Sequence, residues 1–203
     1  MSKIWRGKPI KLCAIPPIKP RFFNALDIMF IKNDMIALRC AEPEDAEMIF
    51  RWENDRDIWR VSGTHVPFTH FQIEQFLLNN NDLFSNKQLR LMIDLNDYGQ
   101  SIGCIDIFDY DNINQRAGLG ILIDKAHRHK GYAKAALALC IEYLFHDIML
   151  HQVYCSIDEA NTESQQLFIN QGFTLCGMRK EWIKSENGYI DVFEYQLINK
   201  NIL

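Results

Sequence analysis

The stretch Ile121–Ala133 constrains the fold of this chain more than any other part of the sequence. It begins as an apolar strand, continues through a short basic loop that contains Gly131, and opens a long helix. From Arg128 to Ala133 the loop reads R-x-x-G-x-A. The first amides of a helix have no intrahelical partner and the helix dipole is positive there, so basic side chains beside them favour an anion site. The stretch therefore predicts a phosphate-binding turn between a strand and a helix, with a solvated basic turn as the alternative.

Two rival phosphate motifs do not fit the sequence. It contains no G-x-x-x-x-G-K-[ST] run. Gly118-Leu119-Gly120 lacks the third glycine of a dinucleotide fingerprint, and it precedes a strand rather than a helix. The turn before the long helix is the phosphate site that remains.

Apolar runs separated by turn residues predict one domain that mixes strands and helices. Short turns after residues 95 and 110 join three consecutive strands, which predicts an antiparallel meander. We predict an α/β (α+β) fold with a mixed, mostly antiparallel sheet of about seven strands and helices on both faces. A polar and aromatic loop is expected over residues 55–68. The expected strands are Met35–Cys40, Gln88–Leu95, Ser101–Tyr110, Arg116–Ile123, His151–Ile157, Phe173–Lys184 and Tyr189–Ile198, and helices are expected to begin at Glu42, Thr69, Gly131 and Asn161 or Thr162.

Charge is distributed unevenly along the chain. Residues 1–34 hold seven Lys/Arg and two Asp, whereas residues 35–203 hold fifteen Lys/Arg and twenty-four Asp/Glu. An acidic body disfavours nucleic acid and favours cationic substrates. No apolar run approaches the roughly 20 residues of a membrane helix, so no membrane partner is expected.

The first 34 residues differ from the rest of the chain. Pro16–Pro20 excludes regular helix and central strand. We predict a basic N-terminal extension over residues 1–34 and a folded domain over residues 35–203. A transit peptide is one alternative for this segment, and a start at Met35 is another.

Cysteine and histidine spacing argues against a metal. The six cysteines form no C-x-x-C pair, and the six histidines show no metal-ligand spacing. We expect reduced cysteines, a cytoplasmic protein and no metal.

A second motif lies in Asn161–Phe173, where an N-x-x-S helix start is followed by x-x-G-F. Together with the basic turn it resembles the acetyl-CoA site of the GNAT (GCN5-related) N-acetyltransferases, in the branch of ribosomal-protein N-acetyltransferases and spermidine/diamine acetyltransferases. Trp52–Asp55 and the hairpin at Asn187–Tyr189 fit that branch too. The resemblance covers residues 35–198 and implies a GNAT acetyltransferase domain.

The resemblance implies direct acetyl transfer from acetyl-CoA, as cosubstrate, to a primary amine. The backbone of the strand before the turn would pair with the pantetheine arm and donate a hydrogen bond to the acetyl carbonyl. Asn161 would contact the cofactor, with a simple N-cap as the alternative. The implied acetyl-CoA residues are Ile121, Leu122, Ile123, Arg128, His129, Lys130, Gly131, Tyr132, Ala133, Lys134, Asn161, Ser164 and Phe168.

Two catalytic side chains that the resemblance leads us to expect are missing. Gly118 stands where many relatives carry a glutamate, and Phe168 stands where many carry a tyrosine, although phenylalanine cannot donate a proton. Asp106 and Asp109, on the adjacent strand, are the candidate bases, with ordinary solvent-facing residues as the alternative. The acid stays open among Ser164, Tyr132, Cys155 and water, and Glu42, Asp45, Glu53 and Asp55 lie where relatives bind acceptors.

The predicted acceptor is a polyamine or diamine of the spermidine type, or a protein N-terminus. An aminoglycoside acceptor is an alternative on the same scaffold. A non-catalytic CoA-binding regulatory module is an alternative of another class. A homo-oligomer is expected, with a small-molecule amine or a peptide as partner.

Overall fold

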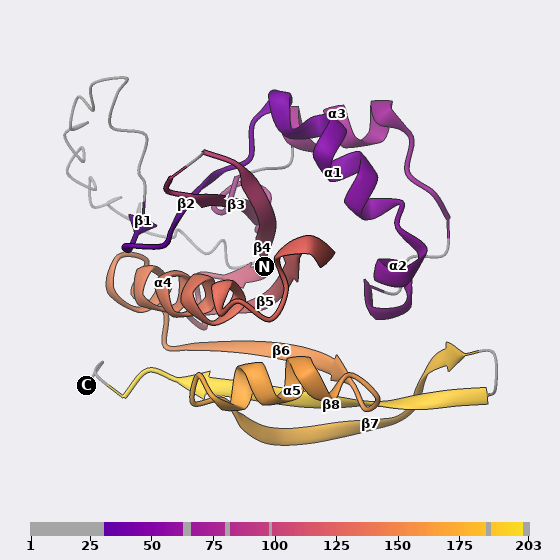
Figure 1. The fold of residues 1–203 in the computed structure, drawn as a ribbon. Helices are drawn as coiled ribbons and strands as arrows, with labels where there is room; N and C mark the ends of the chain where they lie inside the picture. The colour runs from indigo at the N-terminus through magenta and orange to yellow at the C-terminus, as the bar shows by residue number, and fades with distance from the viewer. Residues whose placement is uncertain (1–30, 63–65, 80–81, 98, 186–187, 201–203) are drawn as a thin grey trace, which may run out of the picture.

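The computed structural model describes residues 31–62, 66–79, 82–97, 99–185 and 188–200. In this part of the chain eight strands form one sheet in the order β1-β2-β3-β4-β5-β6-β8-β7 (Figure 1). Neighbouring strands are antiparallel except for β5 and β6, which are parallel. The strands are β1 Ile31–Lys32, β2 Ile36–Cys40, β3 Leu89–Leu95, β4 Ser101–Asp111, β5 Arg116–Ile123, β6 Gln152–Asp158, β7 Thr174–Ser185 and β8 Gly188–Ile198.

Helices cover both faces of this sheet, as predicted. Alternate residues of one strand face opposite layers: Leu91 and Ile93 of β3 pack in the core that includes α4, whereas Met92 packs with α1, α2 and α3. Figure 1 shows α4 and α5 along one side and α1–α3 at the upper right. The helices are η1 Pro43–Asp45, α1 Ala46–Glu53, α2 Arg56–Ser62, α3 His70–Asn79, η2 Lys125–His127, α4 Tyr132–His146 and α5 Thr162–Ile169.

The predicted mixed sheet and its meander are confirmed, and β1 is an addition to the expected strands. The meander is β3-β4-β5. Strand β1 pairs antiparallel with β2, Ile31 lying opposite Leu38, so the end of the predicted extension packs on the sheet. Pro16–Pro20 lies outside the described residues, and the boundary at residue 35 stays a prediction.

The loop predicted over residues 55–68 is wrong for residues 56–62, which form α2. Asp55 lies between α1 and α2 and caps the start of α2: its side-chain Oδ1 accepts from the Asp57 amide at 2.9 Å, and its carbonyl accepts from the Ile58 amide at 2.9 Å. Ile58 is buried against the same core as Trp52 of α1. A local cap and one buried side chain therefore suffice for a short helix in a polar sequence.

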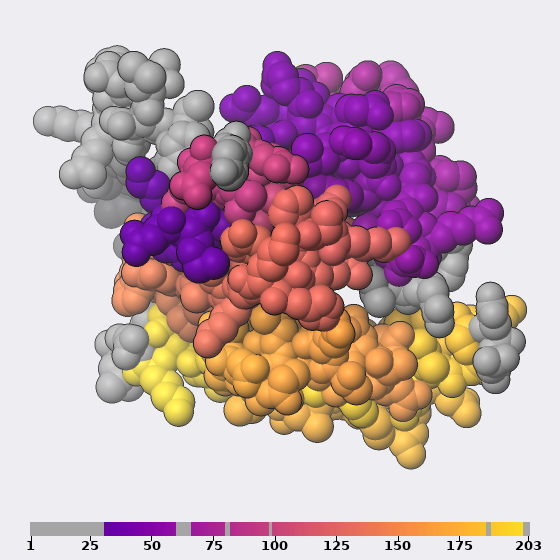
Figure 2. Space-filling model, viewed as in Figure 1, coloured from indigo at the N-terminus to yellow at the C-terminus, as the bar shows by residue number. Residues whose placement is uncertain are grey.

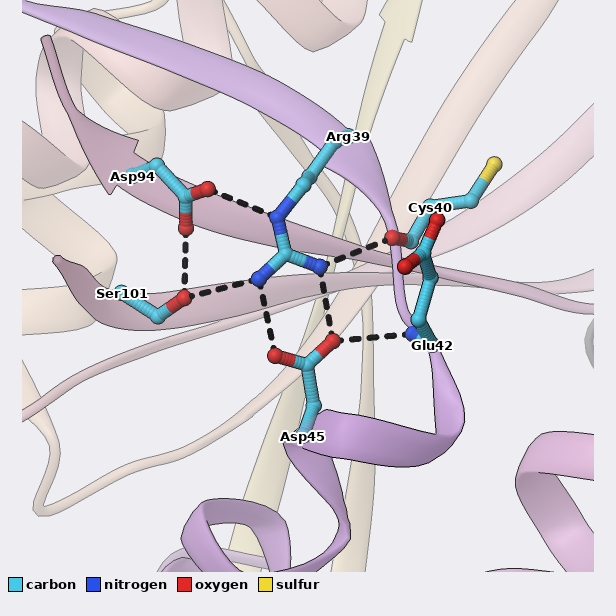
Figure 3. A network of polar contacts seen from close by, with 6 residues as sticks. All are labelled: Arg39, Cys40, Glu42, Asp45, Asp94 and Ser101. Atoms are coloured by element: carbon cyan, nitrogen blue, oxygen red, sulfur yellow. Dashed lines mark hydrogen bonds and ion pairs between the residues drawn. The ribbon is translucent and has the colours of Figure 1, made fainter. Parts of the chain in front are cut away.

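An ion-pair network fixes the start of α1 on the sheet (Figure 3). Both terminal nitrogens of Arg39 donate to Asp45, at 2.7 and 2.8 Å, while Nε donates to Asp94 at 2.7 Å. Burial alone would raise the pKa of Asp45, but hydrogen bonds from Arg39 and from the Glu42 amide outweigh it and the pKa is lowered. The network joins β2 and β3 to the N-terminal end of α1.

The sheet opens between its two parallel strands. The β5–β6 ladder runs only from Arg116 opposite Gln152 to Gly118 opposite Tyr154. Beyond Gly118, β5 keeps its partners on β4 but has none on β6. Figure 1 shows the upper and lower parts of the sheet diverging beside the turn that precedes α4.

Candidate active site

A cavity of about 760 Å³ lies at this opening. It is bordered by β5, the turn before α4, one side of α5, the adjoining ends of α1 and α2, and residues of β3 and β4. Figure 2 shows a hollow on this face where the purple α2 segment, the red turn and the orange α5 segment meet. The cavity thus joins segments that are far apart in the sequence.

The turn before α4 has the backbone shape that the R-x-x-G-x-A pattern predicts. Gly131 is the N-cap of α4 and has φ of 84°, a left-handed conformation that glycine adopts without cost. His129 also has positive φ, 59°, which is strained for a residue with a side chain. Gly131, Tyr132 and Ala133 all line the cavity. The first amides of α4 lack intrahelical partners, so this end of the cavity suits an anion.

The basic side chains of the turn divide into two groups. Arg128 lines the cavity and is anchored because its Nε donates to the Ile123 carbonyl at 3.0 Å. Lys134 of α4 also lines the cavity. Lys130 does not, and its ammonium instead donates to the Ala126 carbonyl at 2.9 Å. Its contact with the cofactor stays a prediction.

His127 is a cavity residue with an unusual ring nitrogen. Its Nδ1 is buried and has no hydrogen-bond partner among the described residues. The Asp124 carboxylate is 4.0 Å away, beyond hydrogen-bonding distance. Asp124 instead accepts from the Trp52 indole at 3.1 Å and from the Ala126 amide at 2.9 Å, which ties α1 to the turn.

The start of α5 forms the facing border of the cavity. Asn161 is its N-cap, and its Oδ1 accepts from the Ser164 amide at 3.1 Å. Both residues line the cavity, so the cap and a cofactor contact are compatible. Phe168 does not line it: the ring is buried in the core, edge-on to Phe173 with centroids 5.0 Å apart.

The structure thus gathers most of the predicted acetyl-CoA residues at one cavity. Lys130 and Phe168 are the two that lie elsewhere. The gathered residues are Ile121, Leu122, Ile123, Arg128, His129, Gly131, Tyr132, Ala133, Lys134, Asn161 and Ser164.

The opposite wall carries a partly buried ion-pair cluster. Arg90 of β3 contacts Glu53 of α1 at 2.7 Å and is bidentate to Asp106 of β4, at 2.6 and 2.9 Å. All three residues line the cavity, together with Cys104. Burial raises the pKa of Cys104 to about 12, so it is a neutral thiol at neutral pH. The sequence reading missed Arg90, although a charge inside the apolar strand β3 was a usable signal.

Of the two candidate bases, only Asp106 lines this cavity. Asp109 lies at a bulge of β4, has φ of 50°, and accepts a hydrogen bond from the Tyr154 hydroxyl at 3.3 Å. It lines a second cavity of about 930 Å³ instead. Among the acid candidates, Tyr132 and Ser164 line the cavity, whereas Cys155 is buried and burial raises its pKa.

Gly118 has a structural reason to lack a side chain. A Cβ at this position would lie 2.2 Å from the ring of Phe108, its register partner on β4. The Phe108 ring also packs edge-on against Tyr154, with centroids 6.1 Å apart. The position of the expected glutamate is therefore covered by an aromatic ring.

The four acidic residues that were expected near an acceptor have different surroundings. Asp45 forms an ion pair with Arg39, and Asp55 forms one with Lys125 at 3.0 Å. Of these four residues, Glu53 lines the cavity, whereas Glu42, Asp45 and Asp55 do not. Asp57, which the sequence reading missed because it was placed in a loop, lines the cavity and pairs with Lys125 at 2.6 Å.

No group of three or more His, Cys, Asp or Glu side chains in the described part is arranged to hold a metal ion. No helix in the described part is long and apolar enough to cross a membrane.

The site thus combines a mixed sheet that opens beside a basic helix N-terminus with carboxylates across the cavity. The model of the acetyltransferase (GNAT) domain family matches residues 36–174, and the chain belongs to this family. It is an N-acetyltransferase.

The relatives include characterised and uncharacterised N-acetyltransferases. The uncharacterized N-acetyltransferase p20 of Bacillus licheniformis is 26% identical over 170 residues, covering 83% of this chain and 95% of that protein. Spermidine N(1)-acetyltransferase of Vibrio cholerae is 24% identical over 172 residues, covering 84% and 97%. The crystal structure of spermidine N-acetyltransferase from Vibrio cholerae in complex with CoA and spermine matches with a TM-score of 0.74 and 24% identity, over 82% of this chain and 96% of that one. This last likeness shows the shared fold.

Proposed function

We propose that the protein transfers the acetyl group of acetyl-CoA to a primary amine of a cationic acceptor. The acceptor is a polyamine or diamine of the spermidine type, or a protein N-terminus. One observation carries the proposal: a single cavity has an anion-suited helix start on one side and an acidic cluster on the other. A cofactor with phosphates and a substrate with ammonium groups would each meet complementary charge.

The donor would occupy the side of the cavity near α4 and α5. Its pyrophosphate would lie at the amides of Gly131–Lys134, beside Arg128. Its pantetheine arm would extend along the β5 backbone beyond Gly118, which has no partner on β6. A β5 amide would donate to the acetyl carbonyl and stabilise the negative charge that develops on its oxygen.

The acceptor would enter from the side of α1 and α2. Its amine nitrogen attacks the thioester carbonyl, a C–N bond forms and the C–S bond breaks. The amine loses a proton, for which Asp106 is the cavity-lining carboxylate among the candidate bases. The leaving thiolate takes a proton, for which the hydroxyls of Tyr132 and Ser164 line the cavity. Alignment of the two reactants would supply much of the rate.

Similarity to a spermidine acetyltransferase supports a polyamine as the acceptor. We also propose a cytoplasmic site of action, because the five described cysteines are unpaired. A homo-oligomer stays a prediction, which light scattering on the full chain would test.

The test is amine-dependent release of CoA thiol from acetyl-CoA by the full chain. A panel of spermidine, putrescine, kanamycin and a peptide with a free N-terminus separates the acceptor classes. We expect the highest kcat/KM with spermidine, putrescine or the peptide. A preference for kanamycin would move the substrate to the aminoglycosides, and release that no amine accelerates would refute the proposal.

A further inference from the structure

We propose that Glu53 and Asp106 together form the subsite that receives the acceptor ammonium, and that Arg90 is a positioning residue that holds them. This inference rests on the proposed function and deepens it by naming the residues that select a cationic acceptor. It concerns substrate binding, whereas the proton transfer discussed above concerns the chemical step.

The geometry places the two carboxylates around a single guanidinium. Glu53 ends α1, while Arg90 and Asp106 lie opposite each other in the β3–β4 ladder. The Arg90 side chain is 12% exposed and the Glu53 side chain 18%. The contacts of 2.6 to 2.9 Å leave little freedom for either carboxylate. A helix and two strands are thereby fixed at one side of the cavity.

Asp106 is the most exposed member of the cluster. Its side chain is 36% exposed, twice the exposed fraction of Glu53. Its register partner on β5 is Gly120, which has no side chain to cover it, and Gly120 also lines the cavity. The carboxylate therefore lies beside the part of β5 that is unpaired on its β6 side, where the proposed acyl donor would lie.

The net charge of the cluster favours the binding of a further cation. Two carboxylates and one guanidinium leave one net negative charge in a partly buried wall. The adjacent thiol of Cys104 is neutral, because burial raises its pKa to about 12. A buried charge without a counter-charge is unfavourable, so a ligand ammonium at Asp106 and Glu53 would stabilise the cluster.

Arg90 is suited to a positioning role. The planar guanidinium can serve two carboxylates at once, which a lysine ammonium cannot match in geometry. Phe76 packs against the guanidinium, 5.3 Å from its carbon to the ring centroid, and limits its movement. Replacement by lysine would keep the net charge while releasing the fixed spacing of Glu53 and Asp106.

The chain offers a matched control for each substitution. Glu47 lies on the same helix as Glu53 but does not line the cavity. Arg39 also bridges two carboxylates, Asp45 and Asp94, at a distance from the cavity lining. Glu47→Gln and Arg39→Lys therefore reproduce the chemical change at residues that do not line the cavity, and thermal unfolding reports any loss of stability in each variant.

The experiment compares KM and kcat for spermidine, with thermal unfolding of each variant recorded alongside. Glu53→Gln, Asp106→Asn and Arg90→Lys are each expected to raise KM by about tenfold or more, because each weakens a charge-assisted contact. For Glu53→Gln and Arg90→Lys, kcat should change far less than KM, the signature of lost binding rather than lost chemistry. Glu47→Gln and Arg39→Lys should leave KM unchanged.

Two results would overturn the subsite. One is an unchanged KM in Glu53→Gln or Arg90→Lys, and the other is an equal rise of KM in the matched control. If the wild type acetylates no amine, the proposed function fails, and calorimetric titration of spermidine into the CoA complex still tests the subsite. Weaker spermidine binding by Glu53→Gln than by Glu47→Gln would then support it, and equal binding would reject it.

Discussion

Two substitutions of Gly131 separate the effect of the turn's backbone conformation on CoA binding from the effect of charge at the turn. Gly131 has φ of 84°, and a Cβ added there would have no heavy atom of the chain within 4 Å. Gly131→Ala should therefore cost only the left-handed backbone conformation, about 1–2 kcal/mol. Gly131→Glu has the same backbone cost and also brings a carboxylate to the proposed pyrophosphate site.

The charge effect is large enough to measure. Two unit charges about 6 Å apart repel by about 3 kcal/mol at an effective dielectric constant near 20. We therefore expect the Kd for CoA of Gly131→Glu to exceed that of Gly131→Ala by about 100-fold. Isothermal titration calorimetry measures both, and the difference should shrink as salt is added. Equal affinity of the two variants for CoA would refute the assignment of this turn to the pyrophosphate.

Three further predictions concern stability. Arg39→Met leaves two partly buried carboxylates without their cation and should lower the free energy of unfolding by about 3–5 kcal/mol in urea titrations. The pKa of Asp45 is lowered in the folded state, so its contribution to the free energy of unfolding is complete above the unfolded pKa of about 3.9 and is lost as pH falls through the folded pKa. Asp45→Asn should therefore make the free energy of unfolding depend less on pH in the acid range. An unchanged pH dependence would contradict this prediction. Gly118→Ala should destabilise by about 1–3 kcal/mol because its Cβ would meet the Phe108 ring, and the same substitution should cost less in a Phe108→Ala background; an equal cost in both backgrounds would show that the ring is not the obstacle.

Local patterns predicted the backbone features that border the cavity at β5, α4 and α5. The glycine turn, the strand before it and the Asn161 cap each depend on residues close together in sequence. Backbone conformation and helix-end chemistry decide such features, and both are encoded within a few residues. The opening between β5 and β6 depends on how two distant strands pair, which no local pattern encodes.

The acceptor side was harder to predict because it depends on contacts between distant segments. Glu53 and Arg90 are brought together only by the packing of α1 on β3. Strand alternation could have separated the two candidate bases, since residues three apart on a strand face opposite sides. The bulge at Asp109 then turns this residue toward Tyr154, which no local signal indicated.

α2 shows how a functional element can be missed in a polar sequence. Residues 56–62 were predicted as loop because their apolar periodicity is short. The helix is supported by the Asp55 cap and by burial of Ile58 against α1, the second of which is a tertiary contact. Asp57 consequently reaches the cavity from a helix rather than from a loop.

The most direct test of the central claim is mass spectrometry of the panel amines after incubation with the full chain and acetyl-CoA. The account predicts that a polyamine, a diamine or the peptide N-terminus gains the mass of one acetyl group, in step with the release of CoA. Tight binding of acetyl-CoA without any acetylated amine would contradict it.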